Sequence, residues 1–179
     1  MVVTKVKQIK SVNKLSDGIK YIEDGAKTIG AELLDSDLNF PIKFVNGQPV
    51  SQLVSGNLII DVESAYSEMM QLKQLANLEK GRPINNEELV KNDVLAHHVI
   101  QSFSPEDNLT PEQVHEIGRK TALELTGGSH QFVIATHMDK GHLHNHIYIN
   151  STNSVTLNKF RWQKGTKKPW SKFLISMLI

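Results

Sequence analysis

The chain has 179 residues, 39% of them hydrophobic, which is enough for one domain to bury a core without covalent crosslinks. It contains no cysteine, so disulfides, zinc–thiolate sites, iron–sulfur clusters and thiol nucleophiles are excluded, and a reducing cytoplasm is expected. Every apolar run is shorter than the roughly 18 residues of a membrane-spanning helix, and the first residues lack the apolar stretch of a secretory signal. We therefore expect a protein without membrane insertion.

The formal net charge is +1, but the charged residues are unevenly distributed along the chain. The first ten residues and the segment after Asn150 carry lysine or arginine and no acidic residue, whereas the middle of the chain is more acidic. Two basic ends indicate a local anionic partner, although two solvated tails would give the same pattern.

The first third of the chain predicts one strand and one helix. Residues 2–9 alternate between apolar and polar side chains, which is typical of a half-exposed strand. A helix should follow, capped by Asn13 or Ser16 and ended by Gly25. Residues 27–56 are rich in glycine, asparagine, aspartate and serine and predict no definite element.

The middle of the chain has clearer patterns. Residues 61–78 place apolar side chains at helical spacing, and the branched and apolar residues of 95–103 favour a strand. The best-defined helix start is a capping box, with Thr110 as N-cap, Pro111 at the first helical position and Gln113 at the third. We expect a pair of glycines to end this helix.

Residues 131–136 and 144–150 should be buried partner strands of a hairpin whose short loop contains Gly141. Strands near both ends with helices between them predict an α+β fold, in a two-layer α/β arrangement, rather than a helical bundle. We expect one domain over residues 1–158. The basic and then apolar segment 159–179 is either a docked terminal element or the edge of a longer protein.

Histidine is concentrated in the stretch HMDKGHLHNH, from His137 to His146, which contains four of the eight histidines in the chain. Residues two apart in a strand share a face, so His144 and His146 should point to the same side. The hairpin would place His137, at the end of the preceding strand, beside them. Three imidazoles could then converge on one cation and leave positions for water or substrate.

The other polar residues of this stretch are assigned accessory roles. His142 lies nearer the turn, and Asp139 is better placed to orient an imidazole than to bind a metal directly. Nitrogen ligands favour Zn²⁺, Mn²⁺, Co²⁺ or Ni²⁺ over Mg²⁺. The competing interpretation is a polar hairpin whose histidines are hydrogen-bonded without a metal. Of the adjacent His97 and His98, at most one can face the hairpin, and we interpret each as a satisfied or exposed side chain.

The stretch THMDKGHLHNHIYINS resembles the third conserved motif of plasmid and transposon mobilisation relaxases, members of the HUH endonuclease superfamily. The superfamily is named for two histidines around a third residue, which here would be His144, Asn145 and His146. Weaker likenesses occur in the family's order at SVNKLSDGIKYIEDGAKT, LVSG, AHHVIQSFSPED and TPEQVHEIG, so the resemblance covers most of residues 1–161.

This resemblance implies a central antiparallel sheet flanked by helices, with Tyr21 as the nucleophile. It also implies one divalent ion held by His137, His144 and His146; Mn²⁺ or Mg²⁺ is expected in function, and Zn²⁺, Co²⁺ or Ni²⁺ could also bind. The implied activity is site- and strand-specific nicking of single-stranded or locally melted DNA at a transfer origin, which starts conjugative mobilisation in the donor cell. Accessory relaxosome proteins and a coupling protein are the implied partners.

The implied chemistry is physically consistent. A cation can neutralise and orient the scissile phosphate. A phenol attacks well only once it loses its proton, and its attack would form a 5′-phosphotyrosyl link that the reverse reaction can reseal. The base could be His142, Asp139 or solvent. Tyr148, on the parity of the strand histidines, is the second candidate nucleophile, and Tyr21 could also be an ordinary tyrosine at the edge of the core.

Contacts to DNA should come from basic and aromatic residues near the two ends. The candidates are Lys5, Lys7, Lys159, Arg161, Trp162 and Lys164. Two other functions remain open: a metal-bearing single-stranded DNA-binding module without cleavage, and a metal hydrolase of small substrates.

Overall fold

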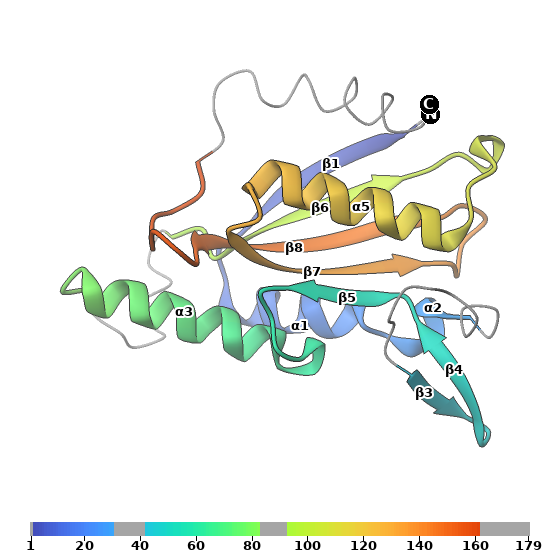
Figure 1. The fold of residues 1–179 in the computed structure, drawn as a ribbon, viewed down its shortest axis with the longest axis horizontal. Coiled ribbons are helices and arrows are strands. Elements are labelled where there is room, and N and C mark those ends of the chain that lie inside the picture. Colours follow the sequence, from blue (N-terminus) through green and yellow to red (C-terminus); the bar gives the residue numbers. More distant parts are fainter. Residues whose placement is uncertain (1, 31–41, 83–92, 162–179) are drawn as a thin grey trace.

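The computed structural model describes residues 2–30, 42–82 and 93–161. Its centre is a five-stranded sheet of order β1-β6-β8-β7-β5, in which all neighbouring strands are antiparallel. A three-stranded sheet of order β2-β4-β3 lies beside it at one end (Figure 1). The strands are β1 (Val3–Ile9), β2 (Ile29–Gly30), β3 (Ile42–Val45), β4 (Gln48–Gln52), β5 (Val54–Asn57), β6 (Ala96–Ser102), β7 (His130–His137) and β8 (His144–Asn153).

Helices cover both faces of the five-stranded sheet (Figure 1). They are α1 (Val12–Ile22), α2 (Gly25–Thr28), α3 (Ala65–Glu79) and α5 (Pro111–Thr126), with short 3-10 turns η2 (Val62–Ser64) and η3 (Pro105–Asp107). Helices α1 and α3 pack on one face in an apolar cluster that includes Leu15, Met69 and Val133. Helix α5 packs on the other face, where Ala122 meets Phe132.

The predicted α+β fold, with an antiparallel sheet flanked by helices, is confirmed. One detail was wrong: the domain has three layers instead of two. The reason is that β7 is buried along its whole length, so both of its faces need cover.

The strongest sequence signals predicted their elements correctly. The capping box is present, because the Thr110 side chain accepts from the Gln113 backbone and the Gln113 side chain accepts from the Thr110 backbone. Gly127 ends α5 with a positive φ of 60°, a conformation that glycine adopts without strain. The hairpin of β7 and β8 forms at the expected position, with β8 extended to Asn153.

The start and end of α1 differ from the prediction. The N-cap is Ser11 rather than Asn13 or Ser16, and its side chain makes no cap hydrogen bond. The helix ends at Ile22, and Gly25 opens the short helix α2 instead of ending α1. The Asp24 side chain accepts from the Ala26 backbone and so caps the new helix start.

After Asn153 the chain turns back on the sheet. Lys159 forms an isolated bridge with Thr152, and Phe160 packs its ring against His97 and His130, with centroids 5.3 and 5.6 Å apart. The apolar C-terminal stretch lies outside the described residues. In the described part of the chain, no helix combines the length and the apolar character needed to cross a membrane.

Candidate metal and nucleophile site

Three histidines meet at the turn end of the β7–β8 hairpin. His137 pairs directly with His144 in the sheet register, and His146 follows two residues later on the same face. The ring centroids are 4.6 to 5.1 Å apart, and one nitrogen of each ring lies within 4.8 Å of the other two. The hairpin therefore brings together the three imidazoles that the sequence singled out.

The hydrogen bonds of each ring show which nitrogen is available. His137 donates from Nε2 to the backbone oxygen of Ile22 at 3.0 Å, and its buried Nδ1 has no hydrogen-bond partner among the described residues. Nδ1 of His144 lies 3.4 Å from the backbone oxygen of His142, and Nδ1 of His146 lies 2.9 Å from Nε2 of His98. One nitrogen of each ring, Nδ1 of His137 and Nε2 of the other two, is thus left for a ligand.

Burial keeps these rings neutral. It lowers the pKa of His137 and of His144 below the usual range, and, with the charges of neighbouring histidines, it lowers the pKa of His146 to about 2. A neutral imidazole has the lone pair that a metal ligand needs. The donor set, the buried free nitrogen of His137 and the neutral rings therefore fit a divalent cation.

Tyr21 stands at the edge of this site. It lies near the end of α1, where Ile19 and Ile22 are buried in the core but Tyr21 is 50% exposed. Its ring centroid lies 5.8 Å from His137 and 6.2 Å from His146, in edge contacts. This exposure is compatible with a tyrosine at the edge of the core, but the ring also lies within contact of two of the three histidines.

Tyr148 has the expected strand parity but a different environment. It is 4% exposed, and its ring stacks on His98 with centroids 4.2 Å apart. Burial raises its pKa to about 12. Its hydroxyl lies directly under Gly18, because a Cβ built at Gly18 would fall 2.2 Å from that oxygen. This packing makes Tyr148 a poor second candidate for the nucleophile.

A lysine that sequence reasoning missed covers the Tyr21 ring. Nζ of Lys27, on α2, lies 3.5 Å from the ring centroid and 3.4 Å from a carboxylate oxygen of Asp24. Partial burial lowers the pKa of Lys27, but its interactions with the Tyr21 hydroxyl and the Asp24 carboxylate raise the pKa by more. The net pKa is therefore raised. The Met138 N–H donates to the Lys27 backbone oxygen at 2.8 Å, which joins α2 to the β7–β8 hairpin.

His98 also belongs to the site, although it was interpreted as satisfied or exposed without a role. In the register it pairs with Tyr148, on the same face as the three histidines, while His97 faces the opposite side of the sheet. The signal in the sequence was the pair of adjacent histidines on a strand. Choosing between them requires the register with β8, which one sequence does not provide.

The remaining predicted residues divide by location. Asp139 and His142 lie on the exposed β7–β8 loop, and the Asp139 charge raises the pKa of His137 and of His144 against the larger effect of burial. Lys5 and Lys7 are exposed on edge strand β1, and their register partners place them on the face of the histidines.

The basic residues near the C-terminal end lie elsewhere. Lys159 forms an ion pair with Asp93 and bridges to Thr152, which is about 27 Å along β8 from His144. Arg161 is exposed next to it, so the structure does not bring this pair to the histidines. Trp162 and Lys164 lie outside the described residues.

Comparison with known proteins identifies the group to which this domain belongs. The family model described as relaxase, MobA/VirD2-like, nuclease domain, matches residues 46–176. The chain is a member of this relaxase family. It is 43% identical over 178 residues to the group II intron-interrupted relaxase LtrB of Lactococcus lactis subsp. cremoris, an alignment that covers 91% of this chain and 32% of LtrB.

Two further proteins align either over a shorter part of the chain or with lower sequence identity. Protein rlx of Staphylococcus aureus is 38% identical over 104 residues, covering 58% of this chain and 29% of rlx. A solved structure of the conjugative relaxase TrwC in complex with oriT DNA, copper-bound, aligns over 99% of this chain and 67% of that one, with 12% identity and a TM-score of 0.48. The chain thus spans about a third of the length of the curated relatives that it matches.

Proposed function

We propose that this relaxase domain nicks one DNA strand at a transfer origin through a covalent link to Tyr21 and rejoins it by the reverse reaction. The observation that carries the proposal is the exposed Tyr21 ring in edge contact with two members of a three-imidazole site. Membership of the relaxase nuclease family supports the coarser statement, a DNA nuclease activity.

The site would work on a phosphodiester as follows. A divalent ion bound by His137, His144 and His146 would neutralise and polarise the scissile phosphate, and Mn²⁺ or Mg²⁺ is the expected ion in function. The Tyr21 oxygen attacks phosphorus, the bond from phosphorus to the 3′ oxygen breaks, and a 5′-phosphotyrosyl link forms. The phenol proton passes to His142, Asp139 or solvent, and the departing 3′ oxygen takes up a proton.

Several residues prepare Tyr21 for this attack. The Ile22 carbonyl accepts from His137, so the helix end that carries the nucleophile is tied to a metal ligand. The Lys27 ammonium over the ring stabilises the negative charge on the attacking oxygen, and the same charge when the phenolate leaves during rejoining. Because the phosphotyrosyl link conserves the energy of the phosphodiester, resealing needs no separate energy source.

The expected substrate is single-stranded or locally melted DNA in the cytoplasm of a donor bacterium. Lys5 and Lys7 offer charges on the sheet face that carries the histidines, where they can pair with backbone phosphates. Accessory relaxosome proteins and a coupling protein are the expected protein partners.

The decisive experiment looks for the covalent link. The chain is incubated with Mn²⁺ and tiled single-stranded oligonucleotides that cover the DNA flanking its own gene. We expect a protein–DNA adduct that survives denaturing electrophoresis, disappears on protease treatment, and is absent from Tyr21→Phe. The matched control, Tyr66→Phe on α3, should form the adduct normally.

The metal is tested with His144→Ala and His146→Ala and with a chelator. Each variant and EDTA should abolish the adduct, added Mn²⁺ should rescue only the EDTA-treated parent, and calorimetry should show weakened Mn²⁺ binding in both variants. Normal nicking by both variants would contradict the metal assignment. Oligonucleotide binding without any adduct would favour a binding module, and hydrolysis of small esters alone would favour a small-substrate hydrolase.

A further inference from the structure

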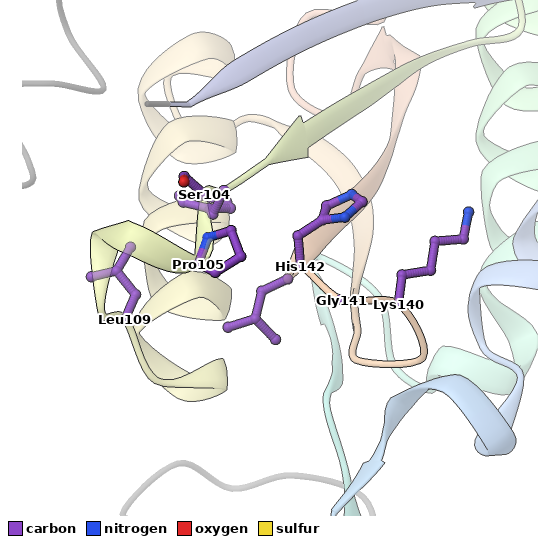
Figure 2. A pocket seen from close by; sticks show the side chains of 8 residues that line it. Ser104, Pro105, Leu109, Lys140, Gly141 and His142 are labelled. Carbon is purple, nitrogen blue, oxygen red and sulfur yellow. The ribbon is translucent and has the colours of Figure 1, made fainter.

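A cavity of about 300 Å³ opens beside the β7–β8 loop, close to the histidine site (Figure 2). Figure 2 shows the η3 segment on one side of it and the loop on the other. The lining residues are Phe103, Ser104, Pro105 and Leu109 on the first side, and Lys140, Gly141, His142 and Leu143 on the second. The volume is at the small end of the range for pockets that hold organic ligands.

The cavity has a fixed apolar floor and a polar rim. Phe103 is 3% exposed and packs in a cluster with Leu109 and Leu143. The Phe103 N–H donates to the Leu143 backbone oxygen at 3.0 Å, so the two walls are joined by a hydrogen bond. Ser104 caps η3 through a reciprocal pair of bonds with Asp107, which holds that wall in place. The shape is therefore largely preformed.

Of the three clustered histidines, His137, His144 and His146, this cavity lies nearest to His144. His142, which lines it, has its ring centroid 5.4 Å from that of His144, and its backbone oxygen lies 3.4 Å from His144 Nδ1. Tyr21 instead contacts the rings of His137 and His146. In Figure 2 the cavity and the blue N-terminal helices lie on opposite sides of the β7–β8 loop.

The geometry of phosphoryl transfer indicates on which side of the site the leaving oxygen lies. The attacking and leaving oxygens lie roughly in line on opposite sides of the phosphorus. If Tyr21 attacks from the side of His137 and His146, the 3′ oxygen departs toward His144 and His142. The nucleotide that carries this oxygen is then directed to the cavity.

We propose that this cavity binds the base of the nucleotide immediately 5′ of the nick, the one that is released with a free 3′-OH. The inference rests on the proposed nicking function and adds a subsite to it. The apolar floor suits the faces of a base, the His142 imidazole can stack on it, and the Ser104 hydroxyl offers a polar contact at the rim. Holding this nucleotide also keeps its 3′-OH next to the phosphotyrosyl link for rejoining.

The test measures DNA binding and not cleavage. Fluorescence anisotropy compares the Tyr21→Phe chain on the oligonucleotide that forms the adduct and on copies with an abasic site on either side of the nick. Removing the base 5′ of the nick should weaken binding roughly tenfold, as expected for a lost stacked base, whereas removing the base 3′ of the nick should have a much smaller effect.

A second variant tests the cavity itself. Leu109→Trp, added to Tyr21→Phe, fills the space and should weaken binding of the intact oligonucleotide by a similar factor, but should not weaken binding of the oligonucleotide that is abasic 5′ of the nick. The matched control is Leu75→Trp, at a residue of α3 that is 48% exposed. Equal affinity for the intact and abasic oligonucleotides would overturn the subsite. The nicking proposal would survive that result, because it depends on the adduct formed by the parent chain.

Discussion

In each of the three imidazoles, of His137, His144 and His146, one ring nitrogen lies within hydrogen-bond distance of a neighbouring group. For His146 the partner is a second histidine, His98, whose Nε2 lies 2.9 Å from Nδ1. If Nε2 of His146 binds a metal, as proposed, then Nδ1 of His146 carries the proton and donates to His98. Such partners fix the tautomer and the ring orientation of a ligand.

Replacing His98 with phenylalanine should keep the stack on Tyr148 but remove the acceptor for His146. We expect the affinity for Mn²⁺, measured by isothermal titration calorimetry, to fall roughly 10- to 100-fold. His97→Phe is the matched control, because it makes the same change on the opposite face of the same strand. Equal affinities in the two variants would argue against an orienting role for His98.

Lys27 lies over the ring of Tyr21, so we expect it to act on the proposed nucleophile and not on the proposed metal ligands. Lys27→Met removes the ammonium that lies over the Tyr21 ring, and we expect initial rates of adduct formation to fall about tenfold while Mn²⁺ affinity stays unchanged. Lys27→Arg keeps the charge and should recover part of the rate. Lys20→Met, on the exposed side of α1, provides the control. A full rate in Lys27→Met would show that the charge is not used.

At the scale of elements, the position of α1 decides where Tyr21, the proposed nucleophile, lies. The helix approaches the sheet so closely that Gly18 rests on the hydroxyl of Tyr148. One turn further along, Tyr21 reaches the histidines, and the helix end is joined to His137 through the Ile22 carbonyl. Close packing at a glycine and one hydrogen bond thus set the distance between Tyr21 and the three histidines.

Gly18→Ala should displace this helix, because the added Cβ would lie 2.2 Å from the Tyr148 oxygen and 2.7 Å from its ring carbon Cζ. Overpacking of this kind costs about 1–3 kcal/mol of stability, which urea denaturation would measure. Adduct formation should fall more than the loss of folded protein explains, since Tyr21 moves with the helix. The double variant Gly18→Ala/Tyr148→Leu vacates the space and should regain adduct. No recovery in that variant would contradict this cause.

Comparing prediction with structure shows which elements a sequence can specify. The helix that begins at Thr110 and the β7–β8 hairpin follow from local chemistry, a capping box and a short glycine-containing loop between apolar runs. The strands between residues 42 and 57 gave no such signal, since they are only four or five residues long and are interrupted by turn residues. Pairing with distant segments, as between β5 and β7, defines them instead.

The candidate site divides in the same way. The three histidines could be found because strand parity and one hairpin are local properties. His98 and Lys27 could not be found, because their roles depend on the register of β6 against β8 and on the packing of α2 beside Tyr21. Contacts made through tertiary structure leave no periodic pattern in the sequence.

For the whole molecule, buried histidines make the stability of the fold depend on pH. Burial is the main cause that lowers the pKa of His97 to about 4 and of His115 to about 3. In the unfolded chain both would titrate near 6.5, so between that value and about pH 4 the unfolded state binds more protons than the folded state. Stability contributed by these two groups is complete above about pH 7 and is lost as the pH falls through that window.

We therefore expect urea denaturation with EDTA present to show a lower free energy of unfolding at pH 5.5 than at pH 7. Each of His97 and His115 should account for about 1 kcal/mol of the difference. His115→Gln keeps an amide that can reach Ser55 and Thr136, the present partners at 2.7 and 2.9 Å, but cannot become protonated. That variant should lose about 1 kcal/mol less on acidification than the parent, and an unchanged pH dependence would show that His115 is not the group responsible.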